Sequence, residues 1–256
     1  AAYAVVSYQT AWLKYYYPVE YMAALMTSVI DNPGKVAEYI YSCRQMGIKI
    51  LPPDINHGYS SFSVDNGSIR YGLAAIKSIG RPVIKEIVAE RKANGEFKNL
   101  KDFIERMSGK DINKRTIENF IKSGAFDELG GTRKQFMVIY VQILDQVNRE
   151  KKNSMTGQMS LFDIVGEEQK SEFDIPLPNV GEYEKSTKLA FEKEVLGIYL
   201  SGHPMEEYEE QWRKGISKTT QDFQFDEELG FSRVSDGAAE IIGGIIASKT
   251  IKYTKN

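Results

Sequence analysis

The chain has 256 residues, of which 42% are hydrophobic and 27% are charged, and its formal net charge is −2. No apolar run approaches the roughly 18 residues that a membrane span requires. Its one cysteine, Cys43, excludes an internal disulfide and lacks the CxxC partner of a zinc site, so we expect it to serve in packing. The composition therefore predicts a cytoplasmic, nucleoid-associated protein without a membrane partner, built from two or three small units.

Charge is unevenly distributed along the chain. Residues 71–125 carry 12 Lys and Arg against 7 Asp and Glu, whereas residues 154–186 carry 2 against 7 and residues 205–230 carry 3 against 8. The acidic blocks are typical of solvated surface. The basic block coincides with a phosphate-sized turn, described below, which favours nucleic acid as its partner.

The first 71 residues predict the helical end of a domain. Apolar residues recur with a helical period from Ala4 to Val29, and Pro18 divides this stretch into two helices that we expect to pack together. Asn32 and Pro33 then begin a third helix that should end near Gly47. Asp65-Asn66-Gly67 is the strongest hairpin signal in the chain.

Residues 72 to about 92 contain a helix-hairpin-helix signature. Two helical runs, from Leu73 and from Arg81-Pro82, meet at a turn in which Gly80 gives the backbone freedom. Amides freed at such a corner form a concavity that fits an anion. A DNA phosphate held there conveys no base sequence, and the residues expected to contact it are Lys77, Ser78, Ile79, Gly80, Arg81 and Lys85.

A second, looser hairpin follows. Asn99 begins a connecting helix through Met107, Asn113 caps a helix from Lys114 to Lys122, and Thr132 with Gln135 forms a capping box before a long helix. We expect the two hairpins to form a pseudo-symmetric pair. The DNA contacts expected from the second are Lys114, Arg115 and Gly124.

Residues 152–182 read as a flexible acidic linker with one apolar island. The island comprises Gln158, Met159, Leu161 and Phe162, and nothing local can bury its large side chains. Leu161 and Phe162 would fill an apolar pocket of a partner, with Gln158 bonding at its edge. The alternative is a hydrophobic turn that docks on this chain's own surface.

The last two segments are a mixed connector at residues 183–238 and a strand-like end at residues 239–256. A helix is expected from Tyr183 to Leu196, with Gly197 as its stop, and a short acidic helix from Met205 to Trp212. The apolar pattern from Glu240 onward predicts the first strands of a β domain.

Several blocks resemble the C-terminal part of the bacterial DNA polymerase III alpha subunits, the C-family replicative polymerases. The matching blocks, which run in order along nearly the whole chain, are residues 2–14, 18–24, 49–56, 113–115, 122–127 and 196–204. The resemblance implies a mainly α chain: the end of a fingers domain at 1–71, a tandem helix-hairpin-helix domain at 72–151, and the start of an OB-fold at 239–256. It also implies that the island binds the sliding clamp, and that duplex DNA and other replisome subunits are partners.

Two departures from the hairpin pattern concern glycine. Many hairpins of this class have glycine at both ends of the turn, and this chain has Ser78 at the first position, where we expect the backbone to avoid a left-handed conformation. The second turn has Gly124 alone, so part of its role is expected to be packing.

No catalytic or metal-binding residue is predicted within the chain. Nucleotidyl transfer needs carboxylates on two metal ions, and no Asp-x-Asp pair occurs, so we expect the chain alone to be inactive and Mg²⁺ to belong to the full polymerase. The acidic run 226–228 reads as solvated surface, and His57 and His203 as structural or exposed residues. Lys14, Tyr15 and Tyr16 fit either a nucleotide contact or a packed helix face.

Two other functions fit the sequence. One is a DNA-repair adaptor with paired hairpins and no polymerase. The other is a protein-interaction scaffold whose hairpins only pack helices, and such a scaffold would not bind DNA at low salt.

Overall fold

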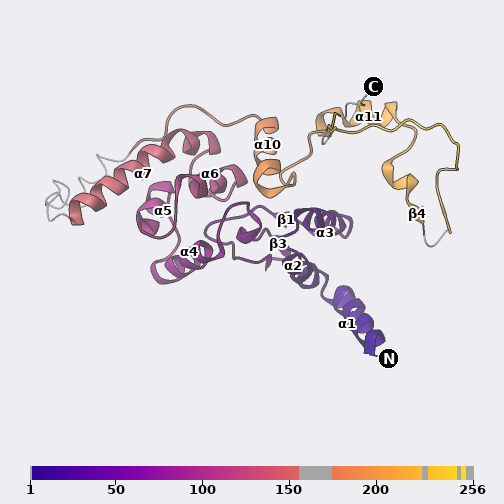
Figure 1. Ribbon diagram of the computed structural model, residues 1–256, viewed down its shortest axis with the longest axis horizontal. Helices are drawn as coiled ribbons and strands as arrows, with labels where there is room; N and C mark the ends of the chain where they lie inside the picture. The colour runs from indigo at the N-terminus through magenta and orange to yellow at the C-terminus, as the bar shows by residue number, and fades with distance from the viewer. Residues whose placement is uncertain (1, 156–174, 227–229, 247–248, 252–256) are drawn as a thin grey trace, which may run out of the picture. The chain divides into compact units, whose positions relative to one another are not determined.

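The computed structural model describes residues 2–155, 175–226, 230–246 and 249–251. The chain divides into two compact units, Ala1–Ser201 and Gly202–Asn256. The described part is mainly α-helical, with short strands (Figure 1). The predicted boundary after residue 71 lies inside the first unit. At this boundary the buried Tyr71 hydroxyl donates a hydrogen bond to the Leu196 carbonyl at 3.3 Å. None of the described helices is long and apolar enough to cross a membrane.

Helices α1 (Ala2–Tyr16) and α2 (Pro18–Ser28) meet at the predicted break. Helix α2 buries Met22, Ala23 and Met26 in the core. Helix α1 extends away from it (Figure 1), and the side chain of Tyr15 is 78% exposed. The two helices therefore pack against each other only at their junction. Within the described residues, Tyr15 does not lie on a packed helix face, which was one of the two roles that the sequence allowed for it.

A small three-stranded sheet follows α3 (Pro33–Gln45), which Asn32 caps by accepting a hydrogen bond from the Lys35 amide at 3.1 Å. The sheet has the order β1-β3-β2. Strand β1 (Ile50–Leu51) is parallel to β3 (Ser68–Arg70), and β2 (Ser63–Asp65) is antiparallel to it. Asn66 and Gly67 have φ of 48° and 75°, so the predicted two-residue hairpin is confirmed.

Four helices form the next part of the first unit: α4 (Arg81–Asn94), α5 (Leu100–Met107), α6 (Lys114–Ser123) and α7 (Arg133–Met155). The caps at Asn99 and Asn113 and the capping box of Thr132 with Gln135 are present as predicted. Between these helices four aromatic rings pack edge to face or tilted at centroid distances of 4.9–6.2 Å: Phe97, Phe103, Phe120 and Phe126.

A charged network joins α4 to α5 beside this core. Arg106 donates to the carbonyls of Glu90, Gly95 and Glu96 and lies over the Phe97 ring at 4.3 Å. Hydrogen bonds from Lys110 and Asn94 are the main reason that the pKa of Glu90 falls to about 2. The network fixes the C-terminal end of α4, which is the end farther along the helix from the first hairpin turn.

After the undescribed stretch 156–174, the chain runs along the start of α7 and then forms α10 (Lys185–Leu196). The Pro178 carbonyl accepts a hydrogen bond from Gln135 Nε2 at 2.9 Å, and the Gly181 carbonyl accepts one from Thr132 Oγ1 at 2.6 Å. Helix α10 packs against α6. It ends at Leu196 with Gly197 as its left-handed C-cap, so the predicted stop at Gly197 is confirmed.

The second unit contains η3 (Glu206–Tyr208), α11 (Glu209–Gly215), η4 (Thr220–Phe223) and the antiparallel strands β4 (Phe225–Asp226) and β5 (Phe231–Ser232). The described residues from 239 onward form no strand. The only sheet partners described in this unit are β4 and β5. The OB-fold at 239–256 stays a prediction.

Candidate nucleic-acid interface

The first hairpin turn joins a 3₁₀ turn, η1 (Leu73–Ala75), to α4. The helical run predicted before the turn is thus a single 3₁₀ turn. Gly80 is the N-cap of α4 with an ordinary φ of −73°, whereas Ser78 has a φ of 62°. The expectation that Ser78 avoids the left-handed region is therefore wrong, and a residue with a side chain holds this conformation at a cost of about 1–2 kcal/mol.

The amides of this turn differ in their availability. Those of Ser78, Gly80 and Arg81, three exposed residues, make no hydrogen bond to any residue that the structure describes. The Ile79 amide donates to the Ile76 carbonyl at 3.3 Å, and the Ile79 side chain is buried. Ile79 therefore anchors the turn in the core, and the expected phosphate contact through its amide is not supported by this geometry.

Basic residues from both predicted sets, Lys77 from the first and Lys114 and Arg115 from the second, line one hollow. It has a volume of about 610 Å³ and lies between the first hairpin turn, the start of α6 and the end of α10. Its cationic residues outnumber its two glutamates, so the hollow is net positive. The lining residues are Lys77, Ser78, Lys114, Arg115, Glu118, Asn119, Lys122, Glu194 and Val195.

The cations around this surface differ in how far internal partners occupy them. Lys122 is held between Glu118 and Glu194 at 2.8 Å from each. Lys114 pairs with Asp145 at 3.3 Å, and exposed Arg81 pairs with Asp31 at 3.1 Å. Arg115 and Lys85 make no ion pair with the residues described. These two carry charge that is most readily available to an external anion.

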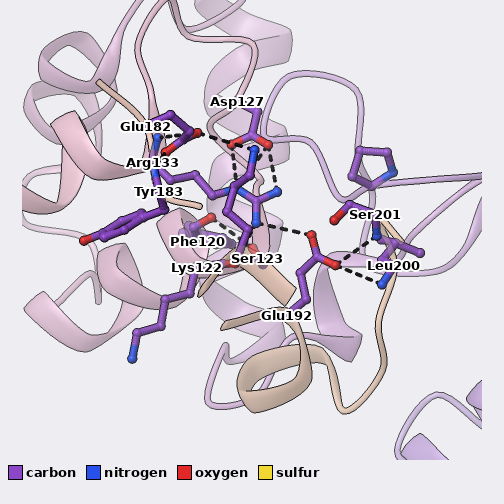
Figure 2. Close-up of polar contacts among 12 residues, drawn as sticks. Phe120, Lys122, Ser123, Asp127, Arg133, Glu182, Tyr183, Glu192, Leu200 and Ser201 are labelled. Atoms are coloured by element: carbon purple, nitrogen blue, oxygen red, sulfur yellow. Dashed lines mark hydrogen bonds and ion pairs between the residues drawn. The ribbon is translucent and has the colours of Figure 1, made fainter. Parts of the chain in front are cut away.

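The second hairpin turn is closed by Arg133, as Figure 2 shows. The guanidinium donates to both carboxylate oxygens of Asp127, to the Lys122 carbonyl at 3.2 Å and to Glu192 at 3.3 Å. Arg133 is 4% exposed and Glu192 1% exposed. Glu192 also accepts the amides of Leu200 and Ser201, at 2.9 Å each.

Gly124 lies beneath this guanidinium. It is buried, has a φ of 83°, and its amide donates to the carbonyls of Phe120 and Ile121. A Cβ at this position would overlap Arg133 and lie 2.9 Å from Asp127 Oδ2. Gly124 therefore has a structural role, and its buried, already bonded amide does not support the DNA contact expected of it.

Comparison with known proteins decides the family. The model of the helix-hairpin-helix motif matches residues 47–136, which include both hairpin turns. The DNA polymerase III subunit alpha of Vibrio cholerae is 41% identical over 218 residues, which are 85% of this chain and 19% of that protein. Those of Escherichia coli K12 and Mycobacterium tuberculosis are 42% identical over 81% of the chain and 37% identical over 100%, covering 18% and 21% of each protein.

The chain belongs to the DNA polymerase III alpha subunit family. It spans about a fifth of the length of these relatives. The matched residues 47–136 include the first hairpin turn and most of the residues that line the hollow, among them Ser78 and Arg115. The lining residues from α10, Glu194 and Val195, lie outside the match.

Several further residues singled out in the sequence have structural surroundings or lie outside the described part. His57 Nδ1 lies 2.9 Å from Oδ1 of the buried Asp54, which also accepts the amides of Asn56 and His57. His203 Nδ1 accepts the Met205 amide at 3.2 Å. Cys43 is buried. The island of Gln158, Met159, Leu161 and Phe162 lies outside the described residues.

The sequence did not predict that α10 contributes residues to the site. Glu192, Glu194 and Val195 come from a segment expected to be a connector, and they contact residues about 60–120 positions earlier. The one available signal was the helical stretch ending at Gly197, which predicts a helix and does not show which surface it covers.

Proposed function

We propose that this chain holds duplex DNA without regard to sequence, as part of a replicative DNA polymerase. The amides of Ser78, Gly80 and Arg81 would donate hydrogen bonds to one phosphate, and the side chains of Lys77, Arg81, Lys85, Lys114 and Arg115 would neutralise neighbouring phosphates. The observation that carries the proposal is that Lys77, Ser78, Lys114 and Arg115, from two separate hairpins, line one hollow.

Phosphate binding of this kind has a defined energetic signature. Each phosphate neutralised by Lys or Arg releases counterions, so that the logarithm of affinity falls linearly with the logarithm of salt concentration by about 0.9 per contact. Backbone amides and cations that reach only phosphates cannot distinguish base pairs. Duplexes of unrelated sequence should therefore bind with equal affinity.

The test is a titration of the chain with duplex DNA at several salt concentrations. Replacing Lys114 and Arg115 by alanine should weaken binding about tenfold or more at low salt and reduce the salt slope by about 2. The matched control replaces Lys35 and Lys49, two exposed lysines away from the hollow, and should leave the slope unchanged. A strong sequence preference, or no binding at low salt, would contradict the proposal and favour a scaffold. The names of the relatives favour a polymerase over a repair adaptor.

We also propose that Gln158, Met159, Leu161 and Phe162 bind the sliding clamp. The support is the sequence of the island and its place between two segments attached to the first unit, α7 and the stretch that begins at Ile175. Two bulky apolar side chains with a glutamine at the edge suit a shallow apolar pocket.

Replacing Leu161 and Phe162 by alanine should abolish clamp binding and lower processivity, while DNA affinity stays unchanged. Clamp binding is measured by surface plasmon resonance with immobilised clamp. Replacing Ile164 and Val165, two apolar neighbours outside the island, is the matched control. Unchanged clamp binding in the Leu161 and Phe162 variant would remove the island from the interaction.

Polymerase activity of the whole protein, with Mg²⁺ as its cofactor, is a proposal that follows from the family. Within the described ranges, no group of three His, Cys, Asp or Glu side chains is placed to hold a metal ion. The proposal concerns the whole protein, of which this chain spans about a fifth, and it names no catalytic residue or Mg²⁺ ligand here. A cytoplasmic, nucleoid-associated location and contacts with other replisome subunits belong to the same proposal.

A further inference from the structure

Lys77, the residue before Ser78, is held at both its amide and its carbonyl by other elements. The Lys77 amide donates to the Val195 carbonyl of α10 at 2.8 Å, and the Lys77 carbonyl accepts a hydrogen bond from Asn119 Nδ2 of α6 at 2.7 Å. Asn119 is buried, so water competes little for this bond. Two helices that lie far along the chain thus fix a single residue before the turn.

The bond from Asn119 acts on the strained residue of the turn. The peptide unit between Lys77 and Ser78 is planar, so holding the Lys77 carbonyl fixes the plane from which the φ of Ser78 is measured. That φ is 62°, in the left-handed region that side chains seldom adopt. In a trans peptide the N–H points opposite to the C=O. The Ser78 amide therefore points away from Asn119, and it has no acceptor among the described residues.

We propose that Asn119 is a positioning residue for DNA binding: it holds the first hairpin turn in its left-handed, phosphate-binding shape, which Ser78 would not keep unaided. The inference rests on the proposed function of the turn. It also explains how serine can occupy a position where many hairpins of this class have glycine. A direct DNA contact by Asn119 is less compatible with the structure, because its Nδ2 already donates to Lys77 and the residue is buried.

The experiment is a double-mutant cycle on the affinity of the full chain for a duplex of arbitrary sequence at low salt. Asn119→Leu keeps the approximate volume and removes the donor, and it should weaken binding about tenfold, equivalent to about 1.4 kcal/mol. Glycine adopts the left-handed region without strain. The same Asn119→Leu change in a Ser78→Gly background should therefore weaken binding less than about twofold.

The control variant is Thr116→Val, which removes a hydrogen bond to Asn113 at the start of the same helix. Its effect on affinity should be the same with and without Ser78→Gly. Equal affinity of Asn119→Leu and wild type would overturn the inference, as would a loss that Ser78→Gly does not reduce. No binding by the wild type would instead overturn the proposed function. If Asn119→Leu does not fold, Asn119→Ser, whose side chain is too short to reach Lys77, takes its place in the cycle.

Discussion

Replacing Arg133 by methionine is expected to lower the free energy of unfolding by about 3–5 kcal/mol. The change leaves Glu192 as a buried carboxylate without its cation and leaves the Lys122 carbonyl without a donor. Removing one partner of a buried pair is costly because the remaining charge is desolvated and uncompensated. The loss is measured by urea denaturation of the chain followed by circular dichroism.

Two further variants show whether the buried charge is the cause. Adding Glu192→Gln to Arg133→Met should recover part of the lost stability, since a neutral side chain still accepts the amides of Leu200 and Ser201. Arg81→Met breaks an exposed pair with Asp31 and should cost less than about 1 kcal/mol. Equal losses for Arg133→Met and Arg81→Met would show that burial adds nothing to the Arg133 interactions.

Replacing Phe103 by alanine should also destabilise the chain by about 3–5 kcal/mol. The side chain is 0% exposed and contacts the rings of Phe97, Phe120 and Phe126, so truncation leaves a cavity between α5 and α6. Because α6 carries Lys114 and Arg115, DNA affinity should fall under conditions in which the variant is partly unfolded. Denaturation monitored by near-ultraviolet circular dichroism reports the loss of aromatic packing.

The controls for this variant separate cavity formation from a general loss of apolar surface. Phe103→Leu fills more of the space and should cost clearly less than Phe103→Ala. Val138→Ala, on an exposed part of α7, should change stability by less than about 1 kcal/mol. A small effect of Phe103→Ala would mean that the four rings repack around the truncated side chain.

Local features of the fold could be predicted because few residues determine them. Asn32, Asn99 and Asn113 each accept an amide three residues ahead, and Asn66-Gly67 closes a two-residue turn whose backbone few other pairs adopt. Such signals depend on neighbours within one turn of chain, so the sequence displays them directly.

The parts that could not be predicted depend on contacts between distant segments. Ser78 follows Lys77, whose carbonyl accepts a hydrogen bond from Asn119 and whose amide donates one to Val195, and no local pattern reveals those partners. Gly124 forms the turn that the sequence predicts, but Arg133, a residue nine positions later, covers it, and the sequence does not reveal this contact. The sequence predicts helix α10, but no local pattern shows that it borders the basic residues Lys77, Lys114 and Arg115.

The contact between Gly124 and Arg133 restricts how this corner can vary among related proteins. A side chain at position 124 would have to tolerate a positive φ and displace the guanidinium, so it is compatible only with a shorter residue at position 133. A shorter residue there would in turn leave the carboxylate of Glu192 to be neutralised in some other way. Substitutions at these three positions should therefore be inherited as a set, and an engineered exchange between family members would need to transfer them together.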